Sequence, residues 1–305
     1  MPPMIATNFG DLIAARVAKI YTDRYRQVPD MLAEFFAFPE LGPQKDSWQV
    51  SEVGAFGDTP EFDGQLDYQD AFQGFLTTLT HKEYASGFQV AVTLFEDEKF
   101  QVIDRLPAAL GTSMGRTRQK HGAEIFNQAF SVDTTWMSRE EGVALCSNTH
   151  TTTSGASTAS GFDNLVTAAL SAVSLQAAKI QGMYLRDDRG NKIDHQFDTL
   201  ITPIDLEETA YELIKSAGKV DTANNNVNIH QGRYTHKMWI HITDVNNWFL
   251  ADAQAMKDSF HFIDRVKASL QQVEDFDTFN SKHRGRQRYS LGWSDWRGIV
   301  GAQVS

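Results

Sequence analysis

The sequence predicts an α+β fold with outlying segments, and three observations lead to that prediction. One helical pattern runs from Asp104 to Phe130, or about 40 Å at ~1.5 Å per residue, which is long for a globular domain. Alternating β patterns flank it over residues 48–100 and 263–305. Residues 197–262 read as a separate α/β unit, because short buried strands alternate there with a helix.

Composition limits the possible classes of protein. The 305 residues suggest about two domains, or one domain with large excursions. The single cysteine, Cys146, excludes a disulfide framework and a cysteine-rich zinc module. Lys+Arg 28 against Asp+Glu 39 gives a net charge of −11, which is unfavourable for a dedicated DNA or RNA reader. With no secretion signal and no long apolar run, we expect a reducing cytoplasm and no membrane.

Residues 1–47 resemble an extended arm that carries one helix. Apolar residues recur at helical spacing over Phe9–Tyr25, and Pro29, Pro39 and Pro43 then break this pattern on either side of the apolar stretch Met31–Phe38. Such a stretch must pack either on its own domain or on a neighbouring molecule. If it is an arm, deleting residues 1–47 leaves a folded core that assembles poorly.

Residues 48–100 predict a long excursion of two or three strands. An acidic, turn-rich stretch over Gly57–Asp70 separates an apolar start at Trp48 from a half-buried strand pattern over Phe88–Leu94. Isolated hairpins are marginally stable in water, so this excursion needs a partner surface.

The long helix is the strongest single prediction. Asp104 can serve as its N-cap, and Pro107 then falls in the first turn, where a missing N–H is tolerated. Gly111, Gly115 and Gly122 each weaken a helix by about 1 kcal/mol relative to alanine. A helix that retains three glycines is expected to have something packed closely against it.

The segment after this helix is expected to contain a short strand, a loop and a second helix. The strand is predicted over Gly142–Cys146, and a Thr/Ser/Gly tract over Thr149–Gly161 predicts a mobile surface loop. Asn164 is the expected N-cap of a helix that continues to about Tyr184. The sequence Asp187–Asn191 predicts a turn.

Within residues 197–262, the pattern alternates between strands and one helix. A buried strand is predicted over Thr199–Thr202, and a helix over Asp205–Lys215 with a capping box formed by Asp205 and Glu208. Further strands are expected over Met238–Ile242 and after Asn246.

The C-terminal region returns to β structure. A strand is predicted around Val266–Gln272, followed by a basic stretch, Lys282–Arg288. Ion pairs with acidic loops of the same or a neighbouring copy suit the acidic chain better than nucleic-acid contact does. The apolar tail with Trp293 and Trp296 is expected to complete a sheet.

Catalytic and metal-binding signatures are few. We find no phosphate loop, dinucleotide fingerprint, nucleophile elbow or zinc-protease motif. The pairs Cys146/His150 and His236/His241 fall short of a metal-ligand set, which needs three or four ligands. Four loop carboxylates also lack calcium-loop spacing: Glu61, Asp63, Asp67 and Asp70. We therefore predict no catalytic, cofactor-binding or metal residues, and no enzyme; a remote alternative is a soluble hydrolase that uses His150 and His195.

Four segments carry a resemblance to a known family. Glu141–His150 resembles the "dG-x-ALF-S-x-x-H" signature of Mu-like major head subunits of tailed bacteriophages. Thr199–Glu207 resembles that family's "tLlVPp-x-Le" element, Trp239–Leu250 is similar to its later strands, and Trp293–Gly298 to its closing "dWR-x-x-yG" pattern. The resemblance spans roughly residues 48–300. Cys146, where an aromatic residue is usual, and the long loop after His150 depart from it.

This resemblance implies the Hong Kong 97-like capsid fold. In its terms, residues 1–47 are the N-terminal arm and residues 48–100 the extended β-hairpin E-loop. Residues 101–196 form the peripheral domain, with its spine helix over about 104–130, and residues 263–305 return to it. Residues 197–262 are the axial α/β domain.

The function that the resemblance implies is that of a major capsid protein. Copies assemble through hexamers and pentamers into the icosahedral head of a tailed double-stranded DNA bacteriophage or prophage. Expected partners are other copies, portal, scaffold or decoration proteins, and packaged DNA bound non-specifically. The expected location is the virion, after assembly in the host cytoplasm. An alternative with the same fold is an encapsulin-like nanocompartment shell.

Overall fold

The computed structural model describes residues 10–40, 46–66, 68–91, 100–218, 226–275 and 280–304. Its helices are α1 (Gly10–Arg26), α2 (Leu32–Phe35), α4 (Phe100–Asn127), α5 (Ala172–Met183), η2 (Ile204–Leu206, 3-10), α6 (Glu207–Lys215) and α7 (Ala253–Ser259). Its strands are β1 (Ser47–Val53), β2 (Gln73–Thr80), β3 (Lys82–Ala91), β4 (Met137–Arg139), β5 (Leu165–Val166), β6 (Thr199–Thr202), β7 (Thr235–Met238), β8 (Trp248–Ala251), β9 (Phe260–Asp275), β10 (Asn280–Trp293) and β11 (Ile299–Ala302).

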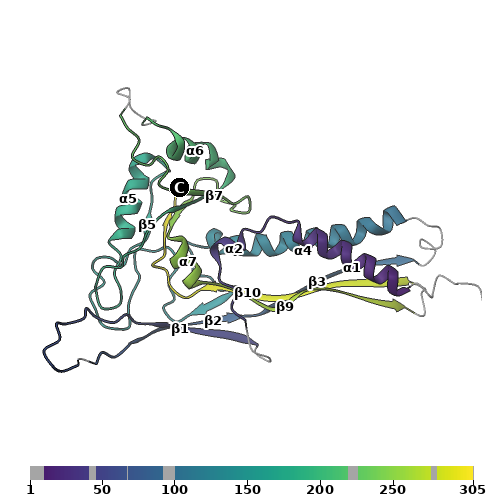
Figure 1. The fold of residues 1–305 in the computed structure, drawn as a ribbon, viewed down its shortest axis with the longest axis horizontal. Coiled ribbons are helices and arrows are strands. Elements are labelled where there is room, and N and C mark those ends of the chain that lie inside the picture. Colours follow the sequence, from purple (N-terminus) through teal and green to yellow (C-terminus); the bar gives the residue numbers. More distant parts are fainter. Residues whose placement is uncertain are drawn as a thin grey trace, which may run out of the picture.

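The molecule is elongated and has three parts (Figure 1). A long layer contains the antiparallel sheet β3-β10-β9, with α4 and α1 lying along it. An upright unit contains the five-stranded sheet β5-β11-β8-β6-β7 with α5 and α6. A small sheet, β1-β2-β4, carries a loop, residues 54–72, that projects away from both. The predicted α+β class is confirmed.

Helix α4 confirms the long helix, but its start differs from the prediction. It begins at Phe100, so Asp104 lies inside it rather than at its N-cap, and Pro107 is also internal. Asp104 instead forms an ion pair with Arg16 of α1, 2.5 Å between the nearest atoms.

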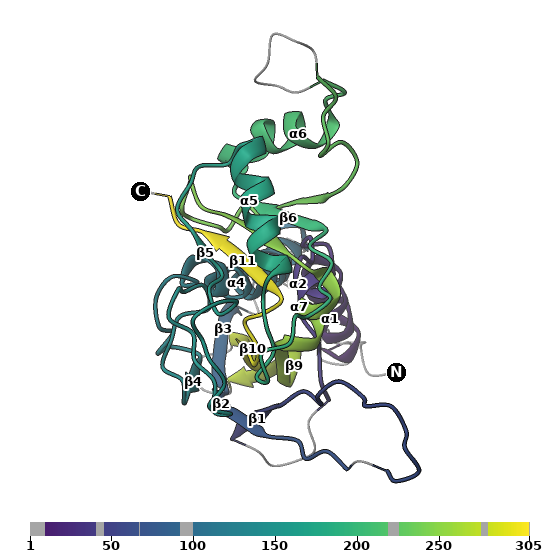
Figure 2. The ribbon, with the colours of Figure 1, turned by 90° about the vertical axis from the view of Figure 1, so that its left-hand side faces the viewer.

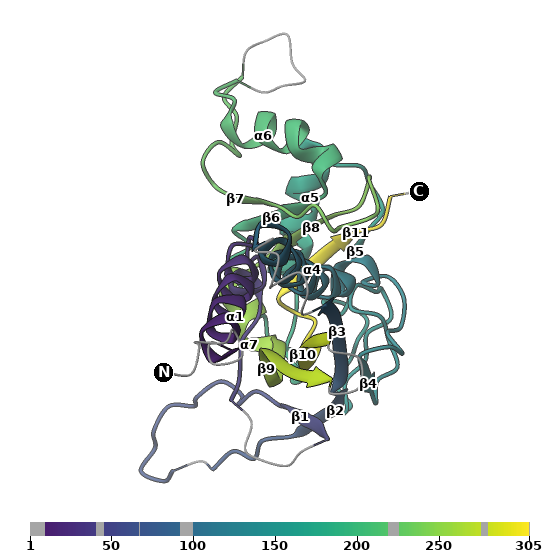
Figure 3. The same ribbon diagram turned by 90° about the vertical axis from the view of Figure 1, so that its right-hand side faces the viewer.

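The three glycines of α4 mark where the N-terminal segment packs. A Cβ at Gly111 would lie 2.5 Å from the carbonyl oxygen of Tyr21, and one at Gly122 would lie 2.0 Å from a methyl group of Leu32. Gly115 faces Val28 and Tyr25 in the same way. The predicted close neighbour is therefore the chain's own N-terminal segment, with α1 visible beside α4 in Figure 3.

This segment is part of the core of its own subunit. Leu32, Phe35 and Phe36 are buried in the main apolar core. Ala37 exchanges two backbone hydrogen bonds with β9, from its N–H to Phe260 and from Phe262 to its carbonyl, both 2.8 Å. Residues 17–37 therefore pack on their own domain, one of the two alternatives that the sequence leaves open, because aromatic side chains there fill space between α4 and the sheet. Residues 1–9 and 41–45 lie outside the described part.

Residues 48–100 do not form one hairpin. β1 pairs with β2, and β2 with β4, whereas β3 pairs along its whole length with β10. The predicted strand over Phe88–Leu94 is confirmed as far as Ala91, and Val92 and Leu94 lie outside the described residues. The excursion finds its partner surface in strands from distant parts of the chain.

The five-stranded sheet draws on three parts of the sequence. β6, β7 and β8 come from residues 197–262, as predicted, but β5 and the C-terminal strand β11 complete the sheet. β11 lies between β5 and β8, so the apolar tail finishes a sheet as expected. The predicted strand over Met238–Ile242 is wrong after Met238, because Trp239 turns inward and the chain forms a turn to Ile242.

Three local predictions are corrected by side chains with other partners. Gly142–Cys146 is not a strand; Gly142 has a positive φ, and the Cys146 N–H donates to Ala129 instead. Asn164 is not a helix cap; it is fully buried and bridges the carbonyls of Leu145 and Ile299. Helix α5 begins instead after Ser171, in a capping box with Ser174.

The Asp205 capping box is also absent. Residues 204–206 form the η2 turn, and α6 starts at Glu207 without a side-chain cap. The strands predicted at residues 199–202, after Asn246 and around 266–272 are confirmed as β6, β8 and β9, and the turn over Asp187–Asn191 is confirmed too.

Candidate functional site

The loop formed by residues 54–72 is the most exposed apolar segment in the described part of the chain. Phe56, Phe62, Leu66 and Tyr68 are between 62% and 86% exposed. No helix or strand is present between β1 and β2 among the described residues. Figures 1 and 2 show the loop standing away from the rest of the molecule. Apolar side chains gathered on an exposed loop indicate a surface that a partner covers.

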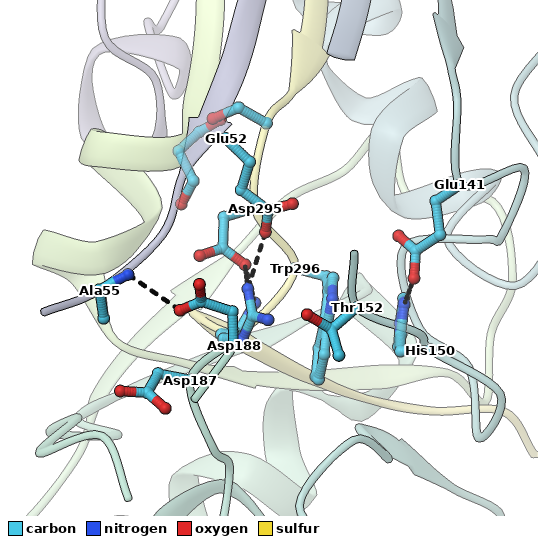
Figure 4. A network of polar contacts seen from close by, with 12 residues as sticks. Glu52, Ala55, Glu141, His150, Thr152, Asp187, Asp188, Asp295 and Trp296 are labelled. Carbon is cyan, nitrogen blue, oxygen red and sulfur yellow. Dashed lines mark hydrogen bonds and ion pairs between the residues drawn. The ribbon is translucent and has the colours of Figure 1, made fainter. Parts of the chain in front are cut away.

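A buried ionic network anchors the strand that leads into this loop. Glu52, on β1, accepts hydrogen bonds from Arg139 at 3.1 Å and from Arg297 at 2.7 Å. Arg297 also pairs with Asp295 at 3.0 Å. Burial, followed by the charge of Asp295, raises the pKa of Glu52, while the two arginines act in the opposite direction. Figure 4 shows Glu52 and Asp295 of this network near Ala55, at the neck of the loop, which we define as residues 54–57 and 69–72. Breaking a buried pair by removing one partner strongly destabilises a fold, so we expect the network to fix the neck.

His150, in the segment Glu141–His150, packs against the C-terminal region. The His150 ring stacks on Trp296, with centroids 3.9 Å apart and an angle of 4° between the planes. Its Nδ1 lies 3.1 Å from the carboxylate of Glu141. Burial alone would raise the pKa of Glu141, but the hydrogen bond and charge of His150, the Thr151 N–H and Arg139 lower it to about 2. His150 therefore ties the 141–151 segment to the C-terminal region.

Helix α5 presents an uncovered apolar stripe. Val173, Ala177, Ile180 and Tyr184 follow one face at spacings of four, three and four residues, and all four are exposed. Figure 2 shows α5 on the outer side of the upright unit. This stripe and the loop are two separate apolar surfaces on one chain.

The basic stretch lies on β10 and is paired within the chain. Lys282 contacts Asp275 at 2.5 Å, Arg286 contacts Glu83 at 2.6 Å and Arg288 contacts Asp46 at 3.6 Å. The predicted ion pairs with acidic residues are confirmed in the same copy. Because these charges are partly neutralised, the stretch is a weak candidate for nucleic-acid contact.

The residues considered for chemistry are not brought together. His150 pairs with Glu141, whereas His195 pairs with Asp252 at 3.4 Å. A cavity of about 370 Å³ lies between the loop's neck and the turn at residues 187–194, and its lining includes neither histidine. In the described residues no group of three or more histidine, cysteine or acidic side chains is arranged to hold a metal ion.

Three other sequence candidates have ordinary positions. Cys146 is buried, and burial raises its pKa far above the ordinary range. His236 contacts the Thr202 hydroxyl at 2.7 Å. Of the four loop carboxylates, Asp67 is outside the described residues, and Glu61, Asp63 and Asp70 are exposed. No helix in the described ranges is long and apolar enough to cross a bilayer.

Sequence reasoning missed the residues that hold the loop's neck. Glu52, Arg139 and Arg297 are far apart in the chain, and no local spacing connects them. Asp187–Asn191 was recognisable as a turn, but its contact with the loop required the tertiary structure.

Comparisons with known proteins agree on the family and the fold. The family model described as phage capsid protein matches residues 76–302. No curated protein matches the sequence. The mature capsid of bacteriophage PhiM1 has a TM-score of 0.56 at 10% identity, covering 92% of this chain and 88% of that chain.

Two further structures are similar at comparable coverage. The capsid of cyanophage Pam1 has a TM-score of 0.52 at 11% identity, covering 92% of each chain. The virus-like particle from Pyrococcus furiosus has a TM-score of 0.51 at 9% identity, covering 95% of this chain and 98% of that one. Because the identities are only 9–11%, these matches establish the fold alone, which is the Hong Kong 97-like fold. Since the family model covers well over half of the residues, the chain belongs to the phage capsid protein family.

Proposed function

We propose that this chain is the major capsid protein of a tailed double-stranded DNA bacteriophage or prophage, and that it builds the icosahedral head through hexamers and pentamers. The family match over residues 76–302 supports this function. The structural observation that carries it is the projecting loop, whose exposed aromatic side chains need a covering partner. In a closed shell, many copies of one modest contact sum to a stable particle.

In this function the parts of the fold take the following roles. The layer of α4, β3, β9 and β10 is the peripheral domain, and the loop between β1 and β2 is the tip of the E-loop region. The five-stranded sheet with α5 and α6 is the axial domain. This assignment adds residues 165–184 and 299–302 to the axial unit expected at 197–262, because β5, α5 and β11 pack in that sheet.

We assign the loop and the α5 stripe to contacts between copies of the chain. Both surfaces carry exposed apolar side chains that nothing in the described part of one copy covers. A protein with this role is a structural subunit without turnover, located in the virion after assembly in the host cytoplasm. Portal, scaffold or decoration proteins would bind assembled copies, and DNA would be enclosed without sequence-specific contacts.

The direct test is expression of the full chain, with a scaffold protein if required, followed by electron microscopy. The expected result is closed particles of uniform size. Phe62→Asp in the loop and Ile180→Asp on α5 should each abolish particles while leaving the melting temperature near that of wild type. Thr112→Asp, at an exposed polar position on α4, is the matched control and should assemble. Only monomers or small rings from the wild-type chain under every condition would contradict the proposal.

The encapsulin-like alternative predicts the same particle with different contents. The similarity to the virus-like particle from Pyrococcus furiosus favours a closed shell without choosing between them. Purified particles from the native source should contain double-stranded DNA if the chain is a phage head subunit. A single enriched cargo enzyme in place of DNA would support the compartment.

A further inference from the structure

We propose that Arg189 and Asp188 form a clip that fixes the direction of the 54–72 loop before copies assemble. Both residues belong to the turn Asp187–Asn191, which follows α5 and contacts the neck of the loop. Its effect on particles rests on the proposed function, whereas its effect on the loop itself does not.

Arg189 connects the two ends of the loop. Its Nε donates to the carbonyl of Ala55 at 2.6 Å, and its Nη2 donates to the carbonyl of Asp70 at 2.5 Å. Its guanidinium also lies over the Phe72 ring, 5.0 Å from the centroid. One planar group therefore joins the two ends of the loop. Lysine has a single nitrogen and no planar fork, so it cannot reproduce this geometry.

Asp188 holds the same neck from the other side of the turn. Its Oδ1 accepts the Ala55 N–H at 2.9 Å, a contact drawn in Figure 4. Its Oδ2 lies 2.2 Å from the position that a Cβ at residue 54 would occupy. An alanine at position 54 would therefore displace this carboxylate and crowd the Phe72 carbonyl oxygen, 3.0 Å away. The Gly54 N–H in turn donates to the Phe72 carbonyl at 2.7 Å, closing the neck.

The turn that carries both side chains is itself well braced. The Asp187 carboxylate accepts the N–H groups of Arg189 and Asn191 at 2.9 and 2.8 Å. Gly190 has a φ of 90°, which suits glycine. Arg297 of the ionic network donates to the carbonyl of Arg186, just before the turn, at 2.9 Å. The clip is therefore attached to the rigid body of the subunit.

Beyond the clip, the Gln69 side chain also joins the two sides of the loop, accepting the Gly57 N–H at 2.6 Å and donating to the Asp58 carbonyl at 3.4 Å. Residues 58–66 form no strand or helix, and the side chains at its tip are exposed. Without the clip, a segment with exposed Phe56, Phe62 and Tyr68 would sample many directions, including contact with its own subunit. Fixing the loop in advance reduces the ordering that assembly must impose, which is the general advantage of preorganisation.

The experiment measures the loop directly by hydrogen–deuterium exchange of the full chain. Wild type, Arg189→Ala, Arg189→Lys and Gly54→Ala are compared in the same assembly state, with Arg233→Ala as the control for loss of an exposed arginine. The expected result is roughly tenfold or faster exchange at residues 54–57 and 69–74 in the first three variants, because one lost charge-assisted contact permits about that change in opening. Arg233→Ala should exchange as wild type does.

Two further readouts separate a clip from a general structural role. Melting temperatures of the Arg189 variants should stay close to wild type, and exchange in α4 and β10 should be unchanged. Particle yield should fall in Arg189→Ala and should not be rescued by Arg189→Lys. Unchanged exchange at the neck in both Arg189→Ala and Gly54→Ala would overturn the clip. If wild type forms no particles, the proposed function fails, while the exchange data still decide whether the clip exists.

Discussion

The N-terminal segment and the 54–72 loop both carry aromatic side chains but place them in opposite environments. The stretch Met31–Phe38 is apolar, whereas the loop is acidic and turn-rich, and the sequence predicts that each needs a surface to pack on. Phe35 is 1% exposed, whereas Phe62 is 69% exposed. The difference lies in the partner: α4 has three glycines that admit residues 21–32 closely, while nothing comparable in the described chain receives the loop tip. Exposed apolar side chains therefore indicate that a segment is covered somewhere. The packing surface available to the segment determines whether its own copy or another copy covers it.

Deleting each region in turn should give the largest difference in stability between the two regions. Removing residues 1–37 takes Leu32, Phe35 and Phe36 out of the main core, so we expect loss of cooperative folding. Replacing residues 58–68 by a short Gly-Ser linker should leave the melting temperature within about 4 °C of wild type but prevent particle formation. Near-ultraviolet circular dichroism, thermal unfolding and electron microscopy measure these outcomes. A truncated chain that unfolds cooperatively at the wild-type temperature would restore the arm interpretation.

Single substitutions test the same comparison without shortening the chain. Phe35→Ala should lower the free energy of unfolding by about 3–5 kcal/mol, because it leaves a cavity beside Phe126 and Trp239. Phe62→Ala should change it by less than about 0.5 kcal/mol, as is usual at exposed positions. Urea unfolding of both variants measures the difference. Equal losses would mean that the loop tip packs on its own subunit.

The loss of folding stability at acid pH is expected to come from buried titratable groups, and His261 is one example. His261 lies beside Trp48 and 3.1 Å from the Ser294 hydroxyl, and burial lowers its pKa from 6.5 to about 4. Between pH 6.5 and 4, His261 is protonated in the unfolded chain but not in the folded chain. The free energy of unfolding therefore falls as pH drops from 6.5 to 4. The loss attributable to this group is about 3 kcal/mol. His261→Gln should reduce the slope of the stability curve in that window, and the remaining slope comes from other buried histidines with lowered pKa values, such as His121 and His283.

Glu141 provides the control for that window. Its pKa is about 2 in the folded chain against an ordinary 4.5, so its contribution is complete above pH 4.5 and is lost as pH falls toward 2. Glu141→Gln should therefore lower stability by a constant amount above about pH 4.5, leaving the slope between pH 6.5 and 4.5 unchanged, and its difference from wild type should shrink only as pH falls toward 2. A His261→Gln curve parallel to wild type between pH 6.5 and 4 would show that this histidine titrates normally in the folded chain.

The sequence was sufficient for features that depend on local pattern. The long helix, the strands at residues 199–202 and 266–272, the turn at Asp187–Asn191 and the paired basic stretch were all predictable. Features that depend on distant partners were not. The local context of Asn164 suits a helix cap, yet its amide donates to the carbonyls of Leu145 and Ile299, which are more than a hundred residues apart in the sequence. The clip and the Glu52 network are of this second kind.

The smallest of the predicted effects is expected at Gly111. Helix propensity favours alanine there, whereas packing against α1 disfavours it. In an exposed helix, Gly→Ala stabilises by about 1 kcal/mol. Here the added Cβ would lie 2.5 Å from the Tyr21 carbonyl, which is backbone and cannot rotate away. Overpacking of this kind costs about 1–3 kcal/mol, so Gly111→Ala should destabilise the chain by roughly 1 kcal/mol net. A gain in melting temperature instead would place α1 off α4, and the N-terminal segment would then behave like the loop, free to find its partner on another copy.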